Sequence, residues 1–127
     1  MAEHNFVGKI GEDLAKEYLE KHGYKILEQN YRTKYAEIDL VASAPGGWAF
    51  GPNTLVFVEV RTKVGENFGT PEDTLNKEKL WKVLQNAKYY SAFKKWEGPE
   101  RIDAICIVLN PDFTISRLTH HENIVEN

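Results

Sequence analysis

The sequence predicts one α/β domain, ordered α-β-β-β-α-β-β, in which helices pack on the faces of a mixed β-sheet. Three observations lead to this class. Apolar residues recur at helical spacing near the N-terminus and again between residues 75 and 96. Short apolar and β-branched stretches bounded by turn-forming residues predict five strands. The second helix separates the third strand from the fourth, so these strands are expected to be parallel and joined by a right-handed crossover.

The first helix is expected from about Asn5 to His22, with Gly23 as its C-terminal cap. Its apolar stripe comprises Val7, Ile10, Leu14, Tyr18 and Leu19. Gly8 and Gly11 lie beside this stripe, although a glycine inside a helix costs about 1 kcal/mol relative to alanine. Two glycines within one turn therefore indicate that another backbone or a ligand approaches closely there, next to Glu12.

The other elements follow from the same patterns. Strands are expected at residues 24–31, 36–43, 54–63, 102–109 and 113–118. Glycine and proline predict loops at residues 44–53 and 64–74, the first joining antiparallel neighbours. A helix is expected at residues 75–96, and a polar tail at residues 119–127.

Length and composition are those of an ordinary globular protein. A chain of 127 residues buries roughly two-thirds of its unfolded surface, so residues 1–127 are expected to form one domain. No stretch has the length of a membrane span and the N-terminus lacks the apolar segment of a signal peptide, so we expect a cytoplasmic protein without a membrane partner. The one cysteine, Cys106, lies in an apolar run and is expected in the core.

The charge distribution is uneven along the chain. The formal net charge is −3, which by itself disfavours a nucleic-acid partner. Between Lys77 and Lys95, however, six lysines accompany one acid, Glu78. The second helix therefore carries a basic surface, which is either a nucleic-acid contact or simply a solvated face.

Two acidic residues stand in the middle of strands, where a carboxylate is costly to bury. Asp39 lies in the second expected strand and Glu59 in the third. An unpartnered, ionised carboxylate is strongly destabilising in such a position, so the pair indicates a bound cation. Strand alternation places Glu59, Arg61 and Lys63 on one face. Two acids on adjacent strands followed by basic residues predict a site for a divalent metal and a phosphate, as in a metal-dependent nuclease.

The sequence also contains an ordered set of motifs: Gly11-Glu12 in the first helix, Glu37-Ile-Asp-Leu40 in the second strand and Phe57-Val-Glu-Val-Arg61 in the third. Lys79 and Arg101-Ile-Asp103 add to this set. Over nearly the whole chain these residues resemble the YraN family, small bacterial proteins grouped with the PD-(D/E)xK nuclease fold and most like archaeal Holliday-junction resolvases. The resemblance implies a single-domain restriction-endonuclease-like fold.

The resemblance further implies an endonuclease that cleaves phosphodiesters of structured or branched DNA. The implied metal ligands are Asp39, Glu59 and Glu12, for Mg²⁺ or Mn²⁺. The implied catalytic residues are Glu12, Asp39, Glu59 and Arg61. The expected nucleic-acid-binding residues are Arg61, Lys63, Lys77, Lys79 and Lys82. A junction has two equivalent scissile strands and would suit a homodimer.

Arg61 departs from the general fold, which has a lysine at this position. Arginine stays protonated and acts only as a donor and a charge, whereas a buried lysine can be tuned to help deprotonate water. Lys63 or Lys79 could supply an ammonium instead. Two hypotheses therefore remain: a metal-dependent endonuclease, or a nuclease-fold module that binds nucleic acid or a protein partner with little or no catalysis.

Each candidate residue also has a structural interpretation. Glu59 and Arg61 could form an ion pair on an exposed sheet face, and Glu12 could pair with Lys16 one helical turn away. Glu37 lies near the start of its strand, which favours simple solvent exposure.

Residues outside the candidate site favour structural roles. Arg101 and Asp103 share a strand face and are expected to brace the sheet. His120 and His121 are adjacent and diverge on a strand, which disfavours a zinc site.

Overall fold

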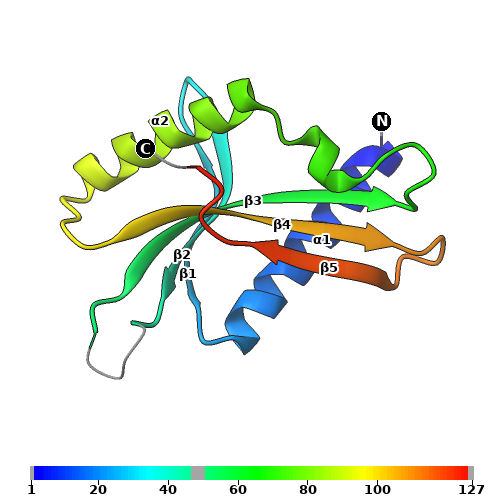
Figure 1. Ribbon diagram of the computed structural model, residues 1–127, viewed down its shortest axis with the longest axis horizontal. Coiled ribbons are helices and arrows are strands. Elements are labelled where there is room, and N and C mark those ends of the chain that lie inside the picture. Colours follow the sequence, from blue (N-terminus) through cyan, green and yellow to red (C-terminus); the bar gives the residue numbers. More distant parts are fainter. Residues whose placement is uncertain (1, 47–50, 126–127) are drawn as a thin grey trace.

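The computed structural model describes residues 2–46 and 51–125, which form a five-stranded sheet with one long helix on each face (Figure 1). The elements are α1 (Ala2–Lys21), β1 (Lys25–Arg32), β2 (Glu37–Ala44), β3 (Thr54–Val64), the short 3₁₀ helix η1 (Pro71–Thr74), α2 (Lys77–Phe93), β4 (Glu100–Leu109) and β5 (Ile115–His121). Residues 47–50 of the expected loop and residues 126–127 of the expected tail lie outside the described residues. Within the described ranges, no helix is both long enough and apolar enough to cross a membrane.

The sheet has the strand order β1-β2-β3-β4-β5. β3 and β4 are parallel and pair from Leu55↔Glu100 to Val64↔Leu109, whereas the other neighbouring strands are antiparallel. α2 lies between β3 and β4 in the chain and forms the expected crossover. The predicted α/β class is confirmed, and the architecture is compatible with the nuclease-like fold that the motifs imply.

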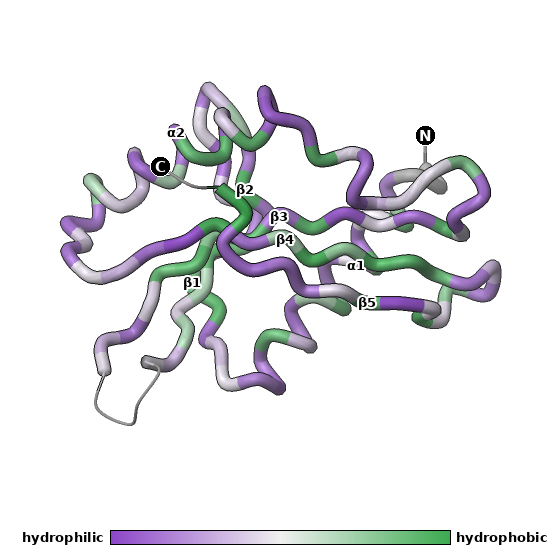
Figure 2. The backbone as a smooth tube through the Cα atoms, in the orientation of Figure 1, coloured by the Kyte–Doolittle hydropathy of each residue, from purple (hydrophilic) through white to green (hydrophobic). Residues whose placement is uncertain are grey.

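Each face of the sheet carries its own hydrophobic core. Val56 and Val58 of β3 face α1 and pack in one cluster with Ala15. Leu55 and Phe57 face α2 and belong to the other cluster. Figure 2 shows the second half of β4 as almost continuously hydrophobic, because this strand is buried on both faces. The predicted alternation along β3 is therefore confirmed, and it places Glu59 on the same face as Phe57.

Several element boundaries differ from those expected, and side-chain caps account for two of the differences. α2 begins at Lys77 and not at residue 75, since the Asn76 side chain caps it by accepting a hydrogen bond from the Lys79 N–H at 2.8 Å. Part of the expected loop at 64–74 forms η1, capped by reciprocal hydrogen bonds between Thr70 and Asp73. β5 continues to His121, three residues into the expected tail.

A buried ion pair fastens β4 to β5 and the C-terminal segment. Asp103 is fully buried and accepts hydrogen bonds from Arg101 Nε, from His120 Nε2 and from the Asn123 N–H. Although burial raises the pKa of Asp103, these hydrogen bonds together hold it below its usual value. The expected structural role of Arg101 and Asp103 is thus confirmed.

Gly11 lets α1 lie directly against β3. A Cβ atom at this position would stand 1.7 Å from Thr62 Oγ1, whereas a Cβ at Gly8 would meet nothing within 4 Å. The close approach expected from the two helical glycines is therefore confirmed at Gly11, and it is a contact with Thr62 of the neighbouring strand.

The two glycines provide a matched test of this contact. Gly11→Ala should lower the free energy of unfolding by about 1–3 kcal/mol through overpacking, whereas Gly8→Ala should raise it by about 1 kcal/mol through helix propensity. Urea denaturation measures both changes. Thr62→Ala removes Oγ1 but leaves a Cβ atom 2.8 Å from the added one, so it should restore part of the lost stability, and only in the Gly11→Ala background. Equal effects of the two glycine substitutions would contradict the contact.

Candidate active site

A groove of about 1180 Å³ runs along β3 between the two helices. Residues of α1, β2, β3, the segment 65–71 and α2 line it. The groove contains the acids Glu12, Glu37, Asp39 and Glu59 together with Arg61, and these five residues come from three different elements. The fold thus brings the predicted acids and the predicted arginine into one open cavity.

Asp39 enters the groove because β2 and β3 stop pairing beside it. The last pair of the ladder is Leu40↔Val58. Beyond it, Oδ2 of Asp39 accepts a hydrogen bond from the Val60 N–H at 2.8 Å, so a side chain replaces the backbone partner. This hydrogen bond sets the Asp39 carboxyl group next to that of Glu59.

Burial makes both carboxyl groups costly to ionise, and the charge of Glu59 adds to this cost at Asp39. Burial, followed by the charge of Glu59, raises the pKa of Asp39 to about 7. Burial also raises the pKa of Glu59, against the opposing effect of Arg61. Near neutral pH, the Asp39 carboxyl group of the metal-free protein therefore retains a proton that an ordinary carboxyl group would have lost.

Glu12 and Glu37 extend this acidic pair toward α1. One carboxylate oxygen from each of Glu12, Glu37 and Asp39 lies within 4.8 Å of the other two. The Nδ2 group of Asn30 donates to Glu12 at 3.0 Å and to Glu37 at 2.8 Å. Burial, and then Asp39, raises the pKa of Glu12.

This arrangement corrects two expectations. Glu37 is not simply solvent-exposed, since it is half-buried in the acidic group and also pairs with Arg32 at 2.9 Å. Among the described residues, Glu12 makes its hydrogen bond with Asn30 and no ion pair with Lys16. Asn30 was not among the predicted site residues, because its role depends on a positive φ of 51° within β1 that no periodicity reveals.

Glu59 is buried and Arg61 is half-buried, and the two do not satisfy each other's hydrogen-bonding groups. Nη2 of Arg61 lies 3.1 Å from Oε1 of Glu59, so the expected ion pair is present, but Glu59 is buried and the pair does not lie on an exposed face. Yet within the described part of the chain, Oε2 of Glu59 and both Nε and Nη2 of Arg61 are buried without a hydrogen-bond partner. Such unsatisfied groups destabilise the fold. Here a carboxylate oxygen that can bind a cation lies beside N–H groups that can donate to an anion.

The basic residues line the groove unevenly. Arg61, Lys63, Lys79 and Lys82 line it, whereas Lys77 is exposed and does not. The charge of Lys79 also lowers the pKa of Glu59, so its ammonium group acts on the acidic pair. Lys63 Nζ is directed to the Phe68 carbonyl at 3.4 Å. Lys63 and Lys79 were both candidates to supply the ammonium group that Arg61 cannot. Of the two, Lys79 is the one whose charge acts on the acids.

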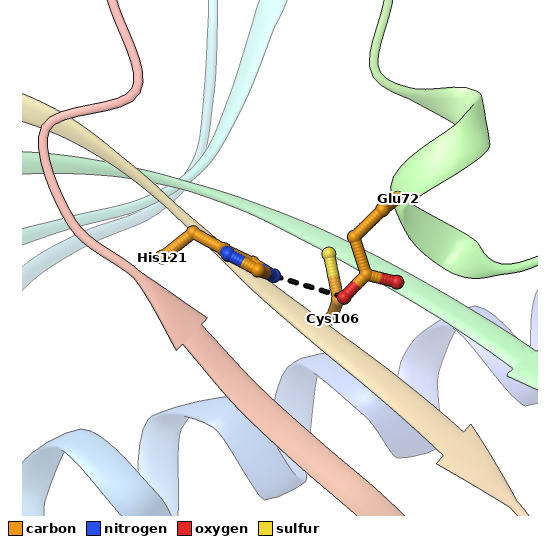
Figure 3. A group of neighbouring side chains, drawn as sticks. All are labelled: Glu72, Cys106 and His121. Atoms are coloured by element: carbon orange, nitrogen blue, oxygen red, sulfur yellow. Dashed lines mark hydrogen bonds and ion pairs between the residues drawn. The ribbon is translucent and has the colours of Figure 1, made fainter.

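A second group of ligand-type side chains lies outside the groove and is held by ion pairs. Glu72 of η1, Cys106 of β4 and His121 of β5 point toward one another (Figure 3). Arg117 binds both oxygens of Glu72, at 2.8 and 3.0 Å, and thereby lowers the pKa of Glu72 to about 2. Burial raises the pKa of the Cys106 thiol to about 12. These groups form a structural network, and Cys106 is buried as expected.

The raised pKa of Asp39 has a consequence for stability. The folded protein keeps a proton that the unfolded chain releases near pH 4, so this group makes the fold less stable as pH rises from about 4 to about 7. Asp39→Asn removes this penalty and keeps an oxygen for the Val60 N–H. With a chelator present, it should raise the melting temperature by roughly 5 °C at pH 8 and by much less at pH 5.

Thermal unfolding of the wild type, Asp39→Asn and the exposed control Asp13→Asn at both pH values measures this effect. The control should behave as the wild type. An equal change in the melting temperature of Asp39→Asn at pH 5 and pH 8 would show that ionisation of this carboxyl group does not destabilise the fold.

Comparison with known proteins places the chain among close relatives. Residues 11–107 match the model described as "Uncharacterised protein family UPF0102". A UPF0102 protein of Caldanaerobacter subterraneus subsp. tengcongensis is 40% identical over 118 residues, which cover 90% of this chain and 89% of the relative. A UPF0102 protein of Flavobacterium johnsoniae is 40% identical over 124 residues, which cover 94% and 95%.

A UPF0102 protein of Thermodesulfovibrio yellowstonii is 42% identical over 101 residues, covering 80% of this chain and 84% of the relative. The matched region contains Glu12, Asp39, Glu59 and Arg61 and extends through most of β4. UPF0102 is also the YraN family that the motifs resemble. The chain belongs to the UPF0102 family.

Proposed function

We propose that this protein is a metal-dependent endonuclease that cleaves phosphodiesters of structured or branched DNA. The observation that carries the proposal is that Glu12, Asp39 and Glu59 line one groove together with basic residues, where burial and the charge of Glu59 raise the pKa of Asp39. Two like charges destabilise each other when they are buried together, so this arrangement is consistent with a cation between them. A homodimer would offer one groove to each of two equivalent strands.

The acids fit a hard divalent cation. Oxygen ligands suit Mg²⁺ and Mn²⁺, and Oε2 of Glu59 is buried without a partner among the described residues. Asp39 and Glu59 would hold the ion, with Glu12 beside them. When bound, the ion would polarise a phosphoryl oxygen and lower the pKa of an attacking water.

The protein's own cations would orient the phosphate. Within the described chain, Nε of Arg61 has no partner and Nη2 has only the ion pair with Glu59, so the guanidinium group can donate to phosphate oxygens. Arginine keeps its charge throughout a reaction, so Arg61 stabilises developing negative charge but accepts no proton. Lys79, placed by the Asn76 cap, adds a second positive charge on the α2 side of the acids.

The alternative is a nuclease-fold module that binds nucleic acid or a protein partner with weak or no catalysis. Arg61 in place of the fold's usual lysine favours this alternative. The retained group of acids favours cleavage, because repulsion among carboxylates would weaken the binding of a polyanion.

Cleavage of branched and linear DNA with Mn²⁺ distinguishes the two functions. We expect slow cleavage that favours branched substrates, ceases with chelator and ceases in Glu59→Ala, which removes a metal ligand. Arg61→Ala should lower the rate on the order of 10²-fold, the scale for losing one transition-state donor. Arg61→Lys should preserve or raise the rate. Glu17→Ala, an exposed acid paired with Lys21 on α1, is the matched control. Binding of branched DNA without Glu59-dependent cleavage would favour the binding module.

Binding should depend on the lysines at the start of α2. The combined Lys79→Glu and Lys82→Glu variant should weaken DNA binding strongly, whereas the same changes at Lys94 and Lys95, beyond the end of the helix, should have little effect. For about four phosphate contacts, wild-type affinity should fall on the order of 10²-fold between 50 and 200 mM salt. Fluorescence anisotropy measures both effects. Equal losses of DNA affinity in the two double variants, or an affinity that does not depend on salt concentration, would exclude this surface as the DNA-binding site.

A further inference from the structure

Phe68 is the most exposed large hydrophobic residue of the described chain. Its side chain is 96% exposed, and the residue lines the same groove as Asp39 and Glu59. Exposing a whole phenyl ring is unfavourable in water, and the ring has no polar group to compensate. The protein therefore holds a bare aromatic surface at the side of the proposed active site.

The segment that carries Phe68 is anchored on both sides. The Gly65 N–H donates to the Leu109 carbonyl at 3.0 Å, which ties the start of the loop to the end of β4. Gly69 has a φ of +108°, which favours glycine and turns the chain back toward η1. Thr70 then begins the capped turn, and Pro71 is buried.

Arg117 connects this loop to the network in Figure 3. Its guanidinium group lies 3.3 Å from Glu66 of the loop and 2.8 Å from Glu72 of η1. His121 also bonds Glu72, at 2.9 Å (Figure 3). The Glu72 network thus fastens the base of the loop to β5, while Phe68 at the tip remains exposed.

We propose that Phe68 stacks on an unpaired base next to the scissile phosphate and so directs this site to DNA with unpaired nucleotides. This inference rests on the proposed nuclease function. A base inside a duplex already has both faces covered by its neighbours, whereas an unpaired base can offer a face to an aromatic ring. Lys63 Nζ, beside the Phe68 carbonyl, provides a positive charge for the phosphate of the same nucleotide.

The test compares binding of two DNA duplexes that differ only by one unpaired 2-aminopurine, in the presence of Ca²⁺. The wild type should bind the duplex with the unpaired base more tightly and quench its fluorescence. Phe68→Ala should reduce this preference about 10-fold, which lies within the range for one base–aromatic stack. Phe68→Trp should keep both the preference and the quenching, and Phe68→Leu should lose both.

Phe93→Ala is the matched control, because Phe93 is 70% exposed at the end of α2 and does not line the groove. It should bind both duplexes as the wild type does. A preference that survives in Phe68→Ala or in Phe68→Leu would overturn the stacking proposal. So would loss of self-association in Phe68→Ala with the base preference unchanged, which would make Phe68 a protein contact.

Cleavage separates failure of this inference from failure of the proposed function. If Glu59-dependent cleavage persists while Phe68→Ala leaves the preference intact, the stacking role fails and the nuclease function stands. If the wild type neither binds nor cleaves DNA, both fail.

Discussion

The backbone N–H of Val60 donates to a carboxylate where a neighbouring strand would otherwise accept its hydrogen bond. This substitution occurs where the β2–β3 ladder ends at Leu40↔Val58, while β3 continues along β4 to Val64. The final residues of β3 therefore have one free edge, which opens into the groove. Glu12 from α1 and the lysines of α2, helices on opposite faces of the sheet, line the same groove at this opening.

The buried and half-buried carboxylates differ in how well they are hydrogen-bonded, and this difference separates the structural ones from those of the proposed active site. Asp103 and Glu72 each accept several hydrogen bonds, and their pKa values lie below the usual range. The pKa values of Asp39 and Glu59 are instead raised, and Glu59 retains a buried oxygen without a partner among the described residues. A satisfied ion pair stabilises the fold, whereas an unsatisfied, like-charged pair reduces stability and is typical of a site that binds something.

Sequence patterns predicted those features of the site that depend on residues close together in the chain. Strand alternation predicted that Glu59 and Arg61 share a face, and the two glycines of α1 predicted a close approach that Gly11 makes to Thr62. Asn30 could not be found in this way, because its position depends on a left-handed residue that turns its amide toward two acids from other elements. The burial of Glu37 was underestimated for the same reason, because burial at the start of a strand depends on which other elements pack over it. The Arg117 network joins residues more than forty positions apart, beyond the range of any periodic pattern.

The order of the elements also means that the residues of the proposed active site are synthesised before the strand that completes the centre of the sheet. Each residue assigned here to metal or phosphate lies before residue 83, but β4, the inner strand that β3 pairs with along its length, begins only at Glu100. A chain emerging from the ribosome thus carries all of these side chains before it can bury β3 between two neighbours. Pairing of β3 with β4 closes a long stretch of chain and is slow for that reason. The sheet that holds the acids is therefore complete only after β4 has been synthesised.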